Sequence, residues 1–144
     1  GDLAAAEHLM REAQQHQLAQ QSRAAPDGTT YAMVICAAAQ QADLSAAERW
    51  FEEAMEAGVE PSLKLLNPVI DAAAMSGDLG AAERWLLRVQ EEGLAPDVVS
   101  FTSAIHAAAR VGNLNAAEHH FAQAEASGVE PNEVMYGALI DAAA

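Results

Sequence analysis

The chain has 144 residues and a formal net charge of −14; apolar residues make up 51% of it and aromatic residues 5%. This length fits one compact domain or about four repeats. The sequence contains no run of about 18 apolar residues, which excludes a transmembrane helix. The acidity argues against a nonspecific nucleic-acid or membrane-surface binder. Cys36 is the single cysteine, so no intramolecular disulfide can form and a reducing compartment is favoured.

A period of 35 residues organises the chain. It is seen in two sets of equivalent positions: Pro61, Pro96 and Pro131, and Leu44, Leu79 and Leu114. Each proline lies in a similar phrase, "VEPS", "LAPD" or "VEPN". A fixed period of this length is the signature of stacked supersecondary units.

Two kinds of helix are predicted in each unit from apolar residues spaced i, i+3, i+4 and i+7. In chain order, the second-helix stripes are Ala6, Leu9, Met10, Ala13; Ala47, Trp50, Phe51, Ala54; Ala82, Trp85, Leu86, Val89; and Ala117, His120, Phe121, Ala124. The first-helix stripes are Tyr31, Val34, Ile35, Ala38; Leu66, Val69, Ile70, Ala73; Phe101, Ala104, Ile105, Ala108; and Tyr136, Leu139, Ile140, Ala143. No segment shows sustained strand alternation. One pair cannot bury both apolar faces, so the pairs are expected to stack as an all-α, right-handed α-solenoid of antiparallel helix pairs.

Turn residues separate the predicted helices. Between the two helices of a unit come Ala42-Asp43, Gly77-Asp78 and Gly112-Asn113, where Gly ends one helix and Asp or Asn caps the next. Ser45 with Glu48 offers a capping box as an alternative start. The second helix is expected to stop at Gly58, Gly93 and Gly128, because a proline follows three residues later.

Two segments depart from the pattern. The first unit contains six extra residues in a stretch rich in Gln and His, Gln14 to Gln21, which is expected to lengthen its helix by more than a turn. This extension is either a partner contact or a solvated segment. Pro68 lies just inside a first helix, where a first-turn proline is tolerated but can shift the helix start.

The residues from Val98 to Asn132 resemble a pentatricopeptide repeat. The shared features are the aromatic residue early in the first helix, the Gly-Asn-Leu turn, the Ala-Glu start of the second helix and the closing Gly-Val-x-Pro-Asn. Full units are 28–62, 63–97 and 98–132, with partial units at 1–27 and 133–144. The competing tetratricopeptide repeat has a period of about 34 residues and a different Trp, Leu-Gly and Tyr pattern. Because the chain begins in mid-unit and stops inside a helix, a longer array is expected.

The resemblance implies binding of single-stranded RNA in a mitochondrion or chloroplast, with about one base per repeat. It assigns base reading to pairs of residues and base packing to one residue per unit. The implied pairs are Ala32 with Ser62, Asn67 with Asp97 (uracil type) and Thr102 with Asn132 (adenine type), followed by Gly137; the base-packing residues are Thr29, Lys64, Val99 and Val134. Ala32 and Gly137 offer no side-chain hydrogen bond. The phosphate-contact positions hold Gln40, Met75 and Arg110, so only Arg110 is basic there.

The acidic residues are expected to point away from RNA. First-helix segments sum to about +1, whereas the acids gather in the second helices, which in this fold form the convex side. Weak binding by three units with one arginine is therefore expected, since phosphate contacts supply most sequence-independent affinity.

Two other function classes compete with RNA binding. A protein-binding scaffold or structural subunit of a large organellar complex, such as a ribosome or photosynthetic assembly, fits the acidity and the gaps at Ala32 and Gly137. An enzyme is disfavoured, since no nucleophile set, phosphate loop or cofactor motif is present. His119 and His120 are adjacent and point about 100° apart on a helix, so a metal site is disfavoured and His120 is interpreted as a packing residue.

Overall fold

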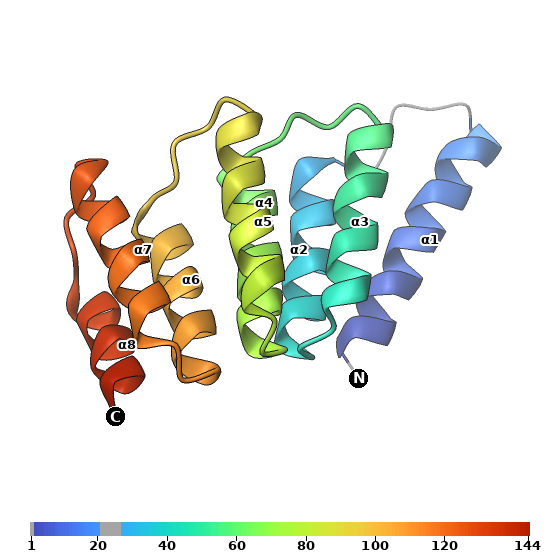
Figure 1. Ribbon diagram of the computed structural model, residues 1–144. Coiled ribbons are helices and arrows are strands. Elements are labelled where there is room, and N and C mark those ends of the chain that lie inside the picture. The colour runs from blue at the N-terminus through green and yellow to red at the C-terminus, as the bar shows by residue number, and fades with distance from the viewer. Residues whose placement is uncertain (1, 21–26) are drawn as a thin grey trace.

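The computed structural model describes residues 2–20 and 27–144, and every regular element in these ranges is an α-helix. The helices are α1 Asp2–Gln20, α2 Gly28–Gln40, α3 Leu44–Glu56, α4 Leu63–Met75, α5 Leu79–Glu91, α6 Val98–Arg110, α7 Leu114–Ala126 and α8 Glu133–Ala143. They follow one another as antiparallel neighbours along an α-solenoid, as the sequence predicted (Figure 1). Within the described residues no helix is long and apolar enough to cross a membrane.

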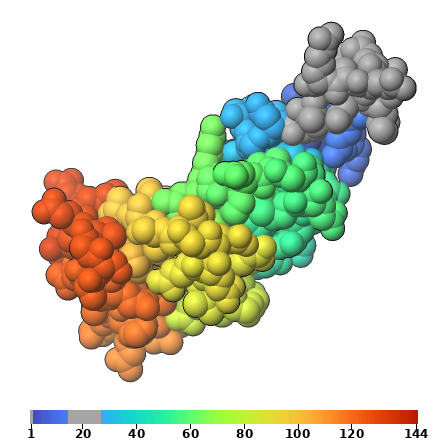
Figure 2. Space-filling model, turned by 90° about the horizontal axis from the view of Figure 1, so that it is seen from above, coloured from blue at the N-terminus to red at the C-terminus, as the bar shows by residue number. Residues whose placement is uncertain are grey.

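The helices form an inner and an outer row. In the inner row α2 contacts α4, α4 contacts α6 and α6 contacts α8, whereas the Cα atoms of α3, α5 and α7 in the outer row stay more than 8 Å from those of the next outer helix. The inner helices can approach because three consecutive alanines, such as Ala72 to Ala74, end the buried face of α4. Closer spacing on one side than the other curves the stack, so the inner row lines its concave face. Figure 2 shows the units succeeding one another in chain order along an elongated body.

The core consists of the predicted stripes where a neighbouring unit covers them. Both stripes of units 28–62 and 63–97 are buried, including Ile70 and Val89 with no exposed surface, and so is the first-helix stripe of unit 98–132. In the second-helix stripe of that last unit, Phe121 is half-buried. The prediction is wrong for part of α8: Tyr136 and Ile140 are 50% and 68% exposed, although their equivalents Phe101 and Ile105 are buried. The same helix face points in the same direction in both cases, but no described helix packs beyond α8.

Leu9 is a second exception to the predicted stripes, with 60% of its surface exposed. It occupies the place in α1 that Trp50 and Trp85 occupy in α3 and α5, where both indoles are buried. Met10, beside it, is fully buried as expected. The interior face of α1 is therefore narrower than that of the later outer helices.

The turns within units are closed by an acidic or amide cap. Asp43, Asp78 and Asn113 accept hydrogen bonds from the backbone N–H three residues on, at 3.0, 2.9 and 3.0 Å. The alternative start at Ser45 is wrong, because Asp43 caps α3 and the helix begins at Leu44. These caps satisfy N–H groups that have no partner inside the helix.

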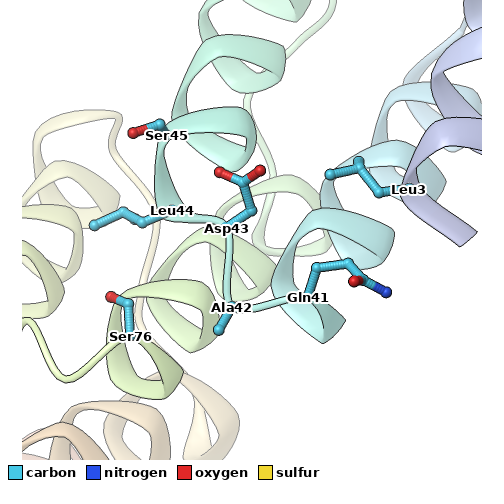
Figure 3. A pocket seen from close by; sticks show the side chains of 7 residues that line it. All are labelled: Leu3, Gln41, Ala42, Asp43, Leu44, Ser45 and Ser76. Atoms are coloured by element: carbon cyan, nitrogen blue, oxygen red, sulfur yellow. The ribbon is translucent and has the colours of Figure 1, made fainter. Parts of the chain in front are cut away.

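One of these turns is strained. Ala42 has φ 53°, whereas the equivalent Gly77 and Gly112 have φ 77° and 69°. A residue with a Cβ pays about 1 kcal/mol or more in this left-handed region. Figure 3 shows Ala42 at the tip of the turn, beside a hollow of about 530 Å³ that Asp43 and Ser76 also line. Asp43 uses its carboxylate as a cap, so this hollow offers little free chemistry.

The two departures from the pattern have different outcomes. The expected lengthening is seen, because α1 has 19 residues where α3 has 13. Gln21, at the end of the Gln-rich stretch, lies outside the described residues. The expected shift at Pro68 is wrong: α4 begins at Leu63, in register with α2 and α6, and Pro68 is its sixth residue. The lost N–H is tolerated in the second turn, where only the carbonyl of Lys64 loses a bond.

The outer helices are joined by a repeated side-chain bond. The indoles of Trp50 and Trp85 donate to Glu7 and Glu48 of the preceding outer helix, both at 2.6 Å. The next copy replaces indole by imidazole, with His120 Nε2 2.8 Å from Glu83. Because α3, α5 and α7 do not touch through their backbones, these bonds and the aromatic contacts beside them set the spacing of the outer row.

Candidate nucleic-acid interface

Two adjacent pockets lie on the inner face. The α4 pocket, about 360 Å³, includes Cys36, Asn67, Asp71, Val99 and Ser103 in its lining. The α6 pocket, about 280 Å³, shares Asp71, Val99 and Ser103 with it and adds residues from α6, the α8 cap and α8: Val98, Thr102, His106, Asn132 and Val134. Two pockets with a common wall are suited to two consecutive units of a linear ligand.

Asn67 is held in one orientation in the α4 pocket. Its amide Nδ2 donates to Asp97 Oδ1 at 3.1 Å, and its Oδ1 accepts from the Ser100 hydroxyl at 2.6 Å. Asp97 is also the N-cap of α6, where the same Oδ1 accepts from the Ser100 N–H at 3.0 Å. These bonds all use Oδ1, which leaves Asp97 Oδ2 as an acceptor and the second Asn67 amide hydrogen as a donor.

Thr102 and Asn132 both line the α6 pocket, and each bonds to a backbone group. Asn132 caps α8, since its Oδ1 accepts from the Met135 N–H at 2.9 Å. The Thr102 hydroxyl donates to the Val98 carbonyl at 2.6 Å. Asn132 is therefore left with its amide as a donor and Thr102 with its oxygen as an acceptor.

Helix capping thus decides which group each repeat presents. The cap uses the acceptor Oδ1 of Asp97 and of Asn132 alike. What remains is an acceptor oxygen in the first case and a donor nitrogen in the second. An exchange of Asp for Asn at this position should reverse the hydrogen-bonding character of a pocket without disturbing the helix start.

The predicted base-packing residues form a row along the same face. Val99 and Val134 are 51% and 59% exposed, and both line the α6 pocket. Of these two valines, only Val99 also lines the α4 pocket. Lys64 and Thr29 line neither pocket; the Lys64 ammonium donates to the Thr29 hydroxyl at 3.3 Å. An apolar wall is therefore complete for the α6 pocket and partial for the α4 pocket.

Gln40, at a predicted phosphate-contact position, lines the α4 pocket, whereas neither pocket is lined by Ala32, Ser62, Gly137 or Arg110. Ala32 is 3% exposed, so it presents almost no surface, and Ser62 makes no side-chain cap bond to α4. Gly137 has open space where a Cβ would stand. Arg110 is exposed in the last turn of α6. Unit 28–62 thus has the backbone of the later units without the polar side chains that are predicted to read bases there.

Asp71, Cys36 and Ser103 were not predicted to line the interface. Burial raises the pKa of Asp71, while the nearby His106 and Arg110 lower it. Burial, followed by the charge of Asp71, raises the pKa of the Cys36 thiol. The sequence contained a signal for these positions, because Cys36, Asp71 and His106 are spaced 35 residues apart. The three side chains differ in chemistry, so the repeat at this position was not recognised.

Several acidic residues of the outer helices form hydrogen bonds or ion pairs with the next outer helix, besides facing solvent. No glutamate lines either pocket, which agrees with the expected separation of charge. Glu7, Glu48 and Glu83 bind the next outer helix, and Glu52 forms an ion pair with Arg88 at 3.1 Å. The interpretation of all these acids as a solvated face is therefore incomplete.

His120 is a packing residue, as predicted, with 4% of its surface exposed. Its two ring nitrogens face Glu83 and Gln123, at 2.8 and 2.9 Å. In the parts of the chain that the structure covers, no three His, Cys, Asp or Glu side chains gather as a metal site would require.

Comparison with known proteins places the chain in a family. A family model described as pentatricopeptide repeat domain matches residues 17–75, 51–103 and 84–144. A crystal structure of the pentatricopeptide repeat protein PPR10 in complex with an 18-nucleotide psaJ RNA element is similar, with TM-score 0.76 and 25% identity over 91% of this chain. PPR10 from maize, also a crystal structure, gives TM-score 0.68 and 25% identity over 89% of it. The chain spans 19% and 18% of those chains. No curated protein matched by sequence.

Proposed function

Because the chain belongs to the pentatricopeptide repeat family, we propose that it is a single-stranded RNA-binding module that reads adjacent uracil and adenine bases. The observation that carries the proposal is the pair of neighbouring pockets. One is lined by Asn67, which is hydrogen-bonded to the α6 cap Asp97, and the other is lined by Thr102 and the α8 cap Asn132. The proposed activity is binding, with no chemical step.

Uracil fits the groups left free at the α4 pocket. Its pairing edge has an N3–H donor beside carbonyl acceptors, so Asp97 Oδ2 accepts from N3–H and the Asn67 amide donates to a carbonyl. Cytosine has an acceptor at N3 and would face the carboxylate with a lone pair. The pocket should therefore discriminate between two bases of equal size.

Adenine fits the α6 pocket. Its pairing edge has an N1 acceptor and an N6 amino donor, which match the Asn132 amide and the Thr102 oxygen. Val99 and Val134 supply apolar surfaces for the faces of the ring. One base per repeat follows from this reading, because each capping residue serves one pocket.

Affinity is expected to be low, because Arg110 is the basic residue at the three phosphate positions. From the family resemblance we further propose that the activity serves RNA metabolism in a mitochondrion or chloroplast. A fluorescent fusion of the full-length protein would test that placement, and a signal outside both organelles would contradict it.

The test of base reading is the double exchange Asn67→Asp with Asp97→Asn. The asparagine introduced at position 97 would still cap α6 and would present a donor, so preference there should move from uracil to cytosine by about tenfold. Binding would be measured by fluorescence anisotropy with RNAs that differ at one base. Glu91→Gln on the outer helix α5 is the matched control and should leave preference unchanged. An unchanged preference in the double variant would count against base reading.

A protein-binding scaffold is the second candidate. The observation that favours it is unit 28–62, where the buried Ala32 leaves no reading group. Cross-links from the inner face to protein subunits, with none to RNA, would make it the better account.

A further inference from the structure

Asp71 lies in the wall shared by the two pockets. It is the one carboxylate among the residues lining them, and it lines both. It comes from the middle of α4, one turn after Asn67, and is half-buried. The double exchange described above does not touch it, and base reading assigns it no role.

The shared wall is the place where a bound strand must pass from one base to the next. With bases in both pockets, the sugar and phosphate that join them lie across this wall. A carboxylate repels a phosphate and cannot donate to it. The pairing edges of the bases are already matched by Asn67 with Asp97 and by Thr102 with Asn132. The remaining donor that RNA offers at this place is a ribose 2′-hydroxyl.

The charges around Asp71 allow a carboxylate in an RNA groove. On the α6 side it faces His106 and Arg110, whose positive charge lowers its pKa against the larger, opposite effect of burial. On the α2 side it faces the neutral thiol-bearing Cys36. Its negative charge is thus partly offset before RNA arrives.

We propose that Asp71 accepts a hydrogen bond from the ribose 2′-hydroxyl between the two pockets and so makes this groove select RNA over DNA. The inference rests on the proposed RNA binding and adds a sugar-reading residue to it. DNA in the same place would leave a half-buried carboxylate without a donor beside a phosphate. The 2′-hydroxyl is the group by which a protein can tell the two nucleic acids apart.

The test uses RNAs carrying adjacent uracil and adenine in which one nucleotide at a time has 2′-fluoro in place of 2′-hydroxyl. Fluorine removes the donor and keeps the ribose-like sugar conformation. For the wild-type chain, one of the two substitutions should weaken binding about fivefold to tenfold. In Asp71→Ala the same substitution should change binding less than twofold.

Two variants control for side effects. Asp141→Ala alters the equivalent residue of α8, which lines neither pocket, and should keep the wild-type sensitivity to fluorine. Asp71→Asn retains an acceptor oxygen and should keep part of that sensitivity. Because the ratio between hydroxyl and fluoro RNAs is compared within each variant, a general gain in affinity from removing the negative charge does not affect the result.

Equal ratios for wild type and Asp71→Ala would overturn the inference, while base-dependent binding in the same experiment would leave the RNA-binding proposal standing. Asp71 would then act as a charge alone. If the wild-type chain bound none of the RNAs, the RNA-binding proposal would fail and the inference with it.

Discussion

Units 28–62 and 63–97 have the same fold and different inner faces. Helices α2 and α4 each have 13 residues, and the apolar residues that face their partners are buried in both. On the inner face, however, the buried Ala32 stands where Asn67 stands one unit later, and Ser62 stands where Asp97 stands. One set of positions therefore builds the stack and another carries the proposed base reading, and the second set differs between the two units while the first is kept.

The largest effect is expected when a hydrogen bond between two outer helices is removed. This bond should contribute to the stability of the stack and not to base preference. Trp85→Phe removes the N–H that donates to Glu48 at 2.6 Å and keeps an aromatic ring. We expect about 2 kcal/mol lower free energy of unfolding, because a hydrogen bond to a charged group is lost. Chemical denaturation would measure it. Base preference of the folded variant should be unchanged; a changed preference would show that stack and reading are coupled.

The next prediction concerns unit 28–62, into which the proposed base-reading pair of the following unit can be introduced. The double variant Ala32→Asn with Ser62→Asp copies the Asn67 and Asp97 pair into unit 28–62. It should bind an RNA with uracil at one further position about tenfold more tightly than one with cytosine there. The wild-type chain, measured in parallel by anisotropy, should show no such preference. Failure of the transfer in a folded variant would mean that the two inner faces differ in more than these residues.

The turns provide a smaller contrast between the same two units. Ala42→Gly should stabilise the chain by about 0.5–1 kcal/mol, because it relieves a left-handed alanine at some cost in unfolded-state entropy. Gly77→Ala should destabilise it by about 1 kcal/mol, although no atom lies within 4 Å of the added Cβ. Thermal unfolding would compare both with wild type. Equal signs for the two substitutions would contradict the account of these turns.

The smallest effect concerns the pH dependence of stability. Burial raises the pKa of Asp71 above the ordinary 3.8, so the ionised form is disfavoured in the folded chain. The wild type should lose stability relative to Asp71→Asn as pH rises through the folded pKa. The variant should thus melt slightly higher than wild type at pH 7, with the difference vanishing below pH 3.8. A difference that persists in acid would require another cause.

Local periodicity was sufficient to predict the helices and most of the core, because each unit repeats the same stripe. It was insufficient for Tyr136 and Ile140, whose burial depends on a neighbouring helix and not on their own stripe. The outer-row bonds were also missed. Glu48 and Trp85, like Glu83 and His120, are 37 residues apart, but the six extra residues in α1 stretch the first copy to 43 and obscure the pattern.

The reading pairs were predicted from the family resemblance, and the residues by themselves offered no reason for them. The structure supplies one, since Asp97 and Asn132 are both caps and keep different atoms free. The 35-residue spacing of Cys36, Asp71 and His106 could have indicated that Asp71 lies on the inner face. Its place in a wall between two pockets could not be predicted, because the pockets form only when α2, α4 and α6 pack together.

The most direct test of RNA reading is fluorescence anisotropy of the wild-type chain with short single-stranded RNAs over a salt titration. The RNAs would carry uracil and adenine at adjacent positions, in either order, with scrambled and poly-C controls. The account predicts saturable binding that prefers one uracil–adenine order and weakens with salt. Equal binding to all sequences, or none even at low salt, would contradict it.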